Sequence, residues 1–263
     1  MELNYKKEKG FTLIEMIIVM AVFFFVIGAA LSIFISIVQN QKKVLAEQQF
    51  LNQISYVEEY MSKALRMAET SIDSDPTTYC IPEGYIYQLT RYDIENKIWR
   101  GIKFINQSDS GKCQEFFLDN LTPNDLAPLK FNDPKNPIIL KELEGAGADV
   151  DDIDAIPLTS PSLQIKAMNF SLNYRDCNSV NQNQTLCGFR SNPPPPDEPY
   201  PVQPRVTILF KVAIPGDSQS DGTSCKNDGM CSADKACDLS AKKCVATKMI
   251  QTTVSRRNLN VQQ

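Results

Sequence analysis

The sequence contains no histidine among its 263 residues. This absence excludes the Ser-His-Asp and Cys-His arrangements of nucleophilic catalysis, and it excludes every metal site that uses an imidazole ligand. A pair of carboxylates remains available for acid–base chemistry, but no Asp/Glu pair stands out as such a site. The sequence therefore favours a protein that is not an enzyme.

An excess of positive charge is also lacking. Lys and Arg together number 27 against 31 Asp and Glu, the net charge is −4, and no long Lys/Arg run occurs. Binding to a phosphate backbone requires a basic face, so we predict no direct contact with nucleic acid. Hydrophobic residues make up 43% of the chain, which suffices for one medium-sized domain with a further segment.

No Cys-x-x-Cys pair occurs, although the chain contains eight cysteines. An even set without metal-like spacing predicts disulfides in an exported protein, whereas in the cytosol the same residues would be free thiols. The interpretation therefore depends on export. The disulfide candidates are Cys80, Cys113, Cys177, Cys187, Cys225, Cys231, Cys237 and Cys244.

One long apolar run follows the short polar N-terminus. Residues 1–10 include Lys6, Lys7 and Lys9, and the run from 11 to 38 carries Glu15 as its only charge. As a helix with a rise of about 1.5 Å per residue it is roughly 40 Å long, which exceeds the roughly 30 Å core of a bilayer. Because the lysines precede the run, we expect a cytoplasmic N-terminus and an extracytoplasmic remainder.

Three simpler interpretations compete for this run. A cleaved secretory signal peptide has a shorter apolar region and ends in a small-residue cleavage site. A buried helix of a soluble domain is rarely so long and apolar. A plain signal anchor explains the hydrophobicity but not Glu15, because a charge at the centre of a membrane helix costs about 2.5–3.5 kcal/mol, less near an end, and requires a partner.

The segment Lys9-Gly10-Phe11-Thr12-Leu13-Ile14-Glu15 resembles the class III signal of type IV prepilins and type II secretion pseudopilins. The resemblance implies that a prepilin peptidase cuts between Gly10 and Phe11 and N-methylates the new amine of Phe11. It implies that Glu15 pairs with the N-terminal amine of a neighbouring subunit and sets the register of helix packing, as a buried polar residue does in a coiled coil. The implied partners are other pilins, the peptidase and an inner-membrane assembly platform.

The helix is expected to continue beyond the membrane, because no Pro or Gly occurs between Gly28 and Asp75. Apolar residues then recur at spacings of three, four or seven, which predicts an amphipathic helix over residues 39–70. A generic amphipathic helix has the same periodicity. Many major pilins have a proline midway along the membrane helix, and its absence here favours a minor pilin or pseudopilin. The expected buried face comprises Val44, Leu51, Ile54, Val57, Met61, Leu65 and Ala68.

The head, residues 71–263, reads as β-rich, with β-branched and aromatic runs between turn signals. We predict an α+β fold in which the long helix packs on a mostly antiparallel sheet; residues 1–10 form a leader and residues 11–38 the membrane and filament-core helix. The candidate strands are Tyr85–Thr90, Ile98–Ile105, Glu115–Leu118, Pro137–Leu143, Leu163–Tyr174, Arg205–Ile214 and Thr247–Ser255.

A second resemblance lies in the C-terminal third. Leu158-Thr159-Ser160-Pro161, Met168-Asn169-Phe170, Pro204-Arg205-Val206-Thr207 and the stretch 251–258 look like the PilW/GspJ-type minor pilins. That group ends in a β-hairpin whose last strand runs into a Thr/Val-rich tail with Arg and Asn. Alternating Thr and Val with an Arg is also ordinary strand chemistry.

A polar insertion, residues 225–244, separates the two strands of that hairpin and contains four cysteines. It has few apolar residues, so two disulfides are expected to stabilise it; the sequence leaves all three connectivities open. The insertion is either an adhesive or partner-binding knob or a stabilised loop. A zinc site would need four thiolates at an unusual spacing. Outside the insertion, Cys177–Cys187 and Cys80–Cys113 are possible pairs.

Two further segments have a composition that suggests a ligand. The proline-rich stretch 192–204 predicts an extended spacer, and an SH3-type ligand is the alternative. Asp149, Asp151, Asp152 and Asp154 form a weak calcium candidate, since they lack the central glycine and final glutamate of an EF-hand. A solvated acidic loop is the simpler interpretation, and we expect no cofactor.

Taken as a whole, the sequence predicts a structural subunit of a type IV pilus or a type II secretion filament. Its place would be the cytoplasmic membrane, with the head outside, before it joins the filament. Two alternatives come from other classes of protein. A pilin-anchored adhesin would bind a ligand through the insertion at residues 225–244, called the cysteine-rich lobe below. A membrane-anchored enzyme would need a polar pocket in the head.

Overall fold

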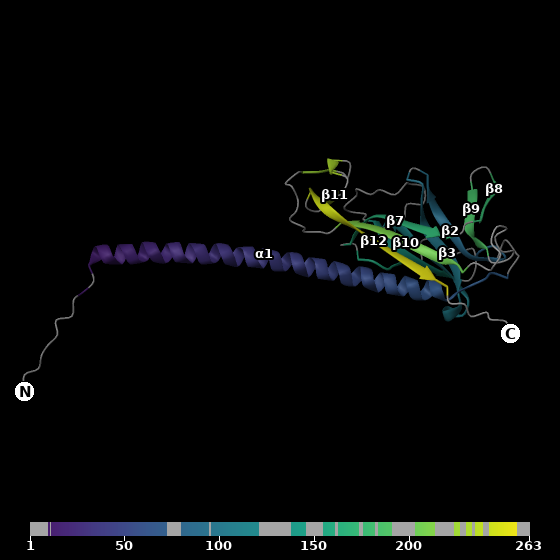
Figure 1. The fold of residues 1–263 in the computed structure, drawn as a ribbon, viewed down its shortest axis with the longest axis horizontal. Coiled ribbons are helices and arrows are strands. Elements are labelled where there is room, and N and C mark those ends of the chain that lie inside the picture. The colour runs from purple at the N-terminus through teal and green to yellow at the C-terminus, as the bar shows by residue number, and fades with distance from the viewer. Residues whose placement is uncertain are drawn as a thin grey trace, which may run out of the picture. The chain divides into compact units, whose positions relative to one another are not determined.

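The computed structural model describes the backbone of the following residues: 10, 12–72, 80–94, 96–120, 138–145, 155–160, 163–173, 176–181, 184–190, 203–213, 224–226, 230–232, 235–238 and 242–256. The chain divides into two units, Met1–Leu45 and Ala46–Gln263. Figure 1 shows the elements of both units in chain order.

One helix, α1 (Leu13–Arg66), spans 54 residues. It ends earlier than the expected residue 70, because Ala68 and Glu69 form the short strand β1 (Ala68–Glu69), which pairs with Asn106 and Ile105 of a neighbouring strand. Lys63 and Arg66 lie in the last turn of α1, where cations offset the negative end of the helix dipole.

The second unit contains two antiparallel sheets, in agreement with the predicted α+β fold. The larger sheet has eight strands, in which β1 pairs with β3 beside the main path. Its main path runs through β6 (Ile156–Pro157), β5 (Ile138–Gly145), β4 (Lys112–Asn120), β3 (Ile98–Asn106), β2 (Tyr85–Asp93), β9 (Gln184–Arg190) and β8 (Asp176–Asn181).

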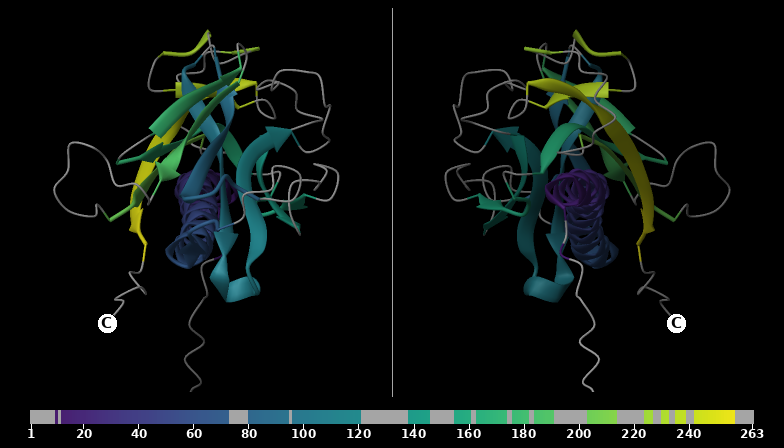
Figure 2. Two further views of the ribbon diagram at one scale, coloured as in Figure 1. Left: turned by 90° about the vertical axis from the view of Figure 1, so that its right-hand side faces the viewer. Right: turned by 90° about the vertical axis from the view of Figure 1, so that its left-hand side faces the viewer.

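The smaller sheet has four strands. Their order is β11 (Lys235–Asp238), β12 (Lys243–Ser255), β10 (Arg205–Ala213) and β7 (Gln164–Leu172). β10 and β12 pair as antiparallel neighbours, with Arg205 opposite Ser255, and the cysteine-rich insertion lies between them in the chain. Figure 2 shows both sheets beside the C-terminal part of α1.

The core of the second unit lies between these sheets and one face of α1. Ile54, Val57, Met61 and Leu65 are buried there, as the periodicity predicts, together with residues of both sheets such as Phe104 and Phe210. Phe50 is also buried. Val44 and Leu51 were expected on this face but are 51% and 44% exposed, because the buried stripe follows the helical period through Phe50 instead.

Seven of the strands correspond to the seven candidate strands of the sequence. The Asn-rich stretch between Cys177 and Cys187 is not among those candidates, and its described residues form strands β8 and β9, which pair with each other. Its low intrinsic β propensity is overridden because β9 pairs with β2, so the sheet provides hydrogen-bond partners for a polar backbone.

Candidate functional site

The start of α1 is the first part of the candidate site. Thr12 caps the helix: its hydroxyl accepts the Glu15 amide at 3.4 Å, and its carbonyl accepts the amides of Glu15 and Met16 at 3.1 and 3.2 Å. Gly10 is exposed, and nothing lies within 4 Å of the place where a Cβ would stand. The open backbone at Gly10 is compatible with close approach by an enzyme. Lys6, Lys7, Lys9 and Phe11 lie outside the described residues.

Glu15 is the acidic residue of the first turn of α1, and its side chain is exposed. A carboxylate at this place interacts favourably with the positive end of the helix dipole. The spacing Thr12-x-x-Glu15 also matches a capping box, a signal that the sequence reasoning missed at Thr12. The local structure therefore gives Glu15 a helix-starting role beside any role in assembly.

The helix surface that follows Glu15 is apolar and open. An 18-residue window of α1 has a mean hydropathy of 2.9 and none of it is buried, so by length and composition α1 is able to cross a membrane. Phe25 is 80% exposed and Phe34 is 63% exposed. A surface of this size requires lipid or other helices around it rather than water.

Comparison with known proteins identifies the same segment. Residues 5–31 of the 263-residue chain match the family model described as the prokaryotic N-terminal methylation motif. No curated protein and no solved structure matches the chain. The motif and the exposed apolar helix together support a type IV pilin-like precursor that is anchored in a membrane, and they suggest a structural rather than a catalytic protein.

Three of the four segments of the second resemblance come together in the smaller sheet, and the fourth, which begins at Leu158, follows β6 of the larger sheet. Met168–Phe170 lies in β7, the segment after Pro204 begins β10, and 251–255 of β12 pairs with 205–209 of β10. The side chain of Thr159 accepts the amide of Leu140 at 3.0 Å. These are ordinary roles in a sheet, and they carry no subtype assignment.

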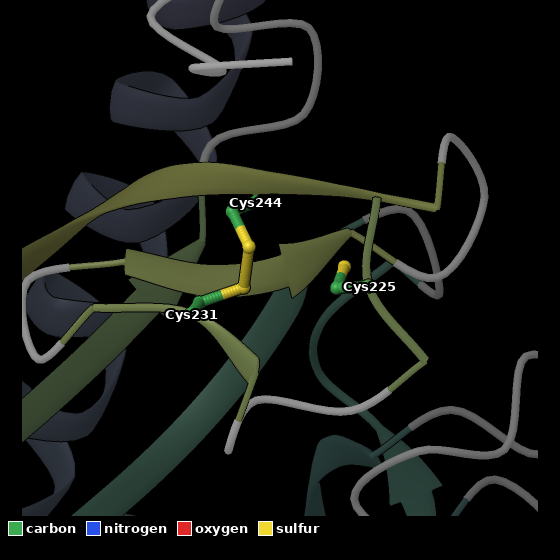
Figure 3. A group of neighbouring side chains, drawn as sticks. All are labelled: Cys225, Cys231 and Cys244. Atoms are coloured by element: carbon green, nitrogen blue, oxygen red, sulfur yellow. A yellow bond between two sulfur atoms is a disulfide. The ribbon is translucent and has the colours of Figure 1, made fainter. Parts of the chain in front are cut away.

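The cysteine-rich lobe is held by two disulfides. Cys225 pairs with Cys237 and Cys231 pairs with Cys244, with Cα–Cα distances of 5.8 and 5.6 Å. The sulfur atoms of Cys225, Cys231 and Cys244 lie within 4.8 Å of one another (Figure 3). Metal binding requires thiolates, and in this oxidised state all three sulfurs are engaged in disulfides, so zinc binding would need prior reduction.

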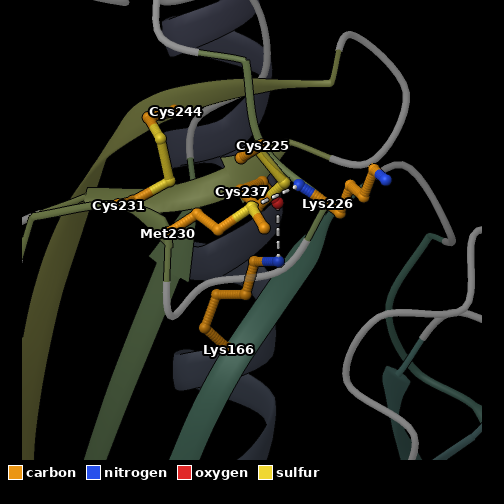
Figure 4. The surroundings of a disulfide bond; sticks show 7 residues. All are labelled: Lys166, Cys225, Lys226, Met230, Cys231, Cys237 and Cys244. Carbon is orange, nitrogen blue, oxygen red and sulfur yellow. Dashed lines mark hydrogen bonds between the residues drawn. A yellow bond between two sulfur atoms is a disulfide. The ribbon is translucent and has the colours of Figure 1, made fainter.

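A buried lysine joins the lobe to the smaller sheet. Lys166 of β7 is 9% exposed, and its ammonium donates to the carbonyl of Cys237 at 2.9 Å (Figure 4). Cys237 and Cys244 are register partners in the β11–β12 pair. The lobe is therefore joined to the rest of the head by the Lys166 contact and by β12, which runs from the lobe into the smaller sheet. The sequence reasoning did not single out Lys166, because a lone lysine in an alternating strand carries no signal of its partner.

The remaining cysteines lie in the larger sheet. Cys80 and Cys113 form a disulfide with a Cα–Cα distance of 5.4 Å. Cys187 is disulfide-bonded, and the backbone of Cys177 lies opposite it in the β8–β9 register. The weak calcium candidate Asp149, Asp151, Asp152 and Asp154 falls outside the described residues, as does most of the proline-rich stretch.

Proposed function

We propose that the protein is a minor pilin or pseudopilin, a structural subunit of a type IV pilus or a type II secretion filament. The observation that carries the proposal is the methylation-motif match at residues 5–31, which overlaps the start of a helix whose most apolar 18-residue window is entirely unburied. Such a helix has two suitable environments in turn: the bilayer before assembly, and a bundle of like helices afterwards.

Processing is the first step of the proposal. A prepilin peptidase cuts after Gly10 and methylates the amine of Phe11, which leaves a positive charge four residues before Glu15. The precursor crosses the inner membrane once, with the head outside. Mass spectrometry of the mature N-terminus tests this step: methylated phenylalanine at position 11 is expected, and an intact leader in cells with an active peptidase contradicts it.

Register is the second step. A carboxylate in an apolar environment gains most when it meets an opposite charge, so Glu15 favours the one axial position at which a neighbour's amine lies beside it. Glu15→Gln keeps the shape and removes the charge. We expect this variant to be inserted and processed but to be strongly depleted in sheared filament fractions, when compared with the parent by immunoblotting.

A matched control separates register from helix packing. Met16→Leu changes the neighbouring exposed residue of the same turn without changing charge, and it is expected to assemble as the parent does. Because Glu15 also lies in the first turn of α1, which Thr12 caps, Thr12→Ala measures the effect of the cap alone. If Glu15→Gln and the parent are present in equal amounts in the filament fractions, the proposed role of Glu15 is contradicted.

The cysteine-rich lobe gives a second candidate, a pilin-anchored adhesin. It is favoured by the lobe's construction, because two disulfides and the Lys166 contact fix a polar surface that exposes Met230 at 53%. Replacing residues 225–244 with a short linker, which removes both disulfides completely, tests this function. Loss of cell or surface adherence with normal assembly supports it, and unchanged adherence contradicts it.

A further inference from the structure

One edge of the smaller sheet is open. β12 is 13 residues long; β10 covers one side of it from residue 247 to 255, and β11 covers the other side from residue 243 to 246. Within the described part of the chain, no strand pairs with the second side from Met249 to Ser255. Figure 2 shows β12 (yellow) at the margin of its sheet.

This edge lacks the features that normally protect one. Exposed edges are commonly blocked by proline, by charged side chains or by a bulge. The stretch 249–255 contains no proline and no charge, and its register with β10 is regular. Ile250, Thr252, Thr253 and Val254 are β-branched residues, which favour strands. The two flanking charges are Lys248, which forms an ion pair with Glu47 of α1, and Arg256, which is partly buried.

A groove accompanies the edge. It has a volume of about 1050 Å³ and is lined by Thr252, Thr253 and Ser255 of β12 and by a polar face of α1 that begins at Ser55 and ends at Arg66. Ligand pockets in proteins commonly span about 300–1,000 Å³, so the groove is large enough for several residues of an extended chain.

The α1 wall of the groove carries ordered charge. Glu58 and Glu59 precede Lys63 and Arg66 by about one to two turns, and all four line the groove. Among the described residues none of the four forms an ion pair. The groove therefore has an acidic section followed by a basic one, which is complementary to a strand with a cation at one end and a carboxylate at the other.

We propose that residues 249–255 and this groove bind an extended peptide segment of a second polypeptide, which adds a strand to the edge of the smaller sheet. Seven residues of strand span about 23 Å, and main-chain hydrogen bonds supply the affinity in this mode of recognition. A helix satisfies its own backbone groups and so leaves the open edge unpaired. Strand addition is independent of the N-terminal anchor; the identification of the second polypeptide as a filament subunit rests on the proposed function.

The direction of the added strand follows from the charges. The Lys248–Glu47 pair lies at the start of the open edge, and Ser255 and Arg66 both line its far end, so β12 and this part of α1 run the same way. A strand antiparallel to β12 then has its N-terminal end beside Lys63 and Arg66. It needs a carboxylate at that end and a cation at its C-terminal end, beside Glu58 and Glu59.

Two capped heptapeptides test binding to the full chain in lipid nanodiscs. The first reads Glu-Thr-Val-Thr-Val-Thr-Lys and the second has its two charged residues exchanged. We expect the first to bind more tightly in fluorescence anisotropy, and N-methylation of alternate amides to weaken it about tenfold, the effect of losing one or two hydrogen bonds. One alternate set of amides faces β12 and the other faces away, so only one of the two methylated peptides should bind weakly. No binding by the unmethylated peptide, or undiminished binding by both methylated peptides, overturns the proposal.

Variants of the groove give a second readout. A variant that combines Glu58→Lys, Glu59→Lys, Lys63→Glu and Arg66→Glu exchanges the charges of the groove and is expected to reverse the preference between the two peptides. The control is Glu83→Lys, which reverses an exposed charge outside the groove and leaves the preference unchanged. Successive amides of a strand point to opposite sides, so one of Thr252→Pro and Thr253→Pro removes an outward amide without breaking the β10 ladder. That variant, recognised by a parent-like melting temperature, must lose peptide binding.

The partner is tested in cells with a photo-crosslinking amino acid in place of Thr253. Crosslinking to another filament subunit identifies that subunit as the source of the strand. Peptide binding in vitro without any subunit crosslink overturns the assignment of a filament partner, and leaves the strand-addition site standing. Failure of the peptide experiments, with Glu15-dependent assembly intact, overturns the site and leaves the filament function standing.

Discussion

The hydroxyl of Tyr60 lies 2.8 and 2.9 Å from the two carboxylate oxygens of Glu142, and it connects α1 to β5. The side-chain amide of Gln114 in β4 also donates to Glu142. Burial raises the pKa of Glu142, against the hydrogen bonds from Tyr60 and Gln114, while Glu144 and Asp109 raise it further. Burial and the hydrogen bond to Glu142 raise the pKa of Tyr60.

The raised pKa of Glu142 predicts a pH-dependent stability. The folded head holds this proton more tightly than the unfolded chain does, so the free energy of unfolding falls as pH rises from the ordinary glutamate pKa, about 4.3, through the higher folded value. Glu142→Gln keeps an acceptor for Tyr60 and removes the titration. We expect the variant to lose this decline, as measured by urea unfolding between pH 4 and 8.

The control for that measurement is Glu83→Gln, which removes an exposed carboxylate. It should retain the parent's pH profile. An identical profile for Glu142→Gln and the parent would show that the Tyr60–Glu142 contact does not perturb the proton equilibrium.

The disulfide between Cys80 and Cys113 closes a stretch with a sequence separation of 33. In the chain-entropy model its removal costs about 3–4 kcal/mol. The double variant Cys80→Ala/Cys113→Ala is therefore expected to lower the free energy of unfolding by about that amount, in guanidinium titrations followed by tryptophan fluorescence. Trp99 is the only tryptophan and lies in the core of the head.

The lobe supplies the comparison for this prediction. Cys225→Ala/Cys237→Ala removes a bridge with a sequence separation of 12, and the lobe cysteines form a cluster separate from the main core. We expect its loss to loosen the lobe and to leave the Trp99 transition close to that of the parent. Equal shifts of that transition for both double variants would contradict the separation of lobe and core.

How far the sequence predicts this fold depends on whether a signal is local. The apolar run and the alternation within β10 and β12 are properties of neighbouring residues, and the long helix and the main strands follow from them. The burial of Phe50 in place of Leu51 depends on where the sheets lie along α1, which periodicity alone does not define.

Long-range pairings were beyond the sequence for the same reason. The Lys166–Cys237 contact joins residues 71 positions apart, and the β8–β9 hairpin exists because β2 accepts β9 at its side. The lobe's connectivity was one of three equivalent choices. In each case tertiary packing brings the contact partner close, and the residue types and spacings in the neighbouring sequence do not predict which partner it is.

The surroundings of Gly188 in β9 leave no room for a side chain at this position. A Cβ there would meet the carbonyl oxygen of Tyr87 and would lie 2.6 Å from the Tyr85 ring, and the Tyr87 side chain is fully buried. Overpacking of this kind costs about 1–3 kcal/mol. Gly188→Ala should lower the free energy of unfolding of the head by that order in denaturant titrations.

Gly28 is the matched glycine. Nothing lies within 4 Å of the place where its Cβ would stand, and alanine is favoured over glycine in helices. Gly28→Ala is expected to leave the unfolding transition of the head unchanged. A parent-like stability for Gly188→Ala would mean that β9 moves away from β2 at low cost.

Loss of the contact between Lys166 and Cys237 is expected to lower the local stability of the lobe and not the global stability of the head. Lys166→Met keeps an unbranched side chain of similar length and removes the ammonium, so the carbonyl of Cys237 loses this donor. Because burial of a charge is itself costly, the free energy of unfolding of the head should change little. The hydrogen bond from a charged donor contributes about 1.5–3 kcal/mol locally, which corresponds to at least a tenfold loss of amide protection.

Hydrogen exchange followed by mass spectrometry measures that loss. We expect faster exchange in peptides that cover β11 and the start of β12, where the lobe joins the sheet, and unchanged exchange where β7 pairs with β10. Lys211→Met, a partly exposed lysine of β10, controls for the removal of a charge from the same sheet. If both variants exchange as the parent does, the two disulfides alone hold the lobe in place and the buried lysine contributes nothing to its attachment.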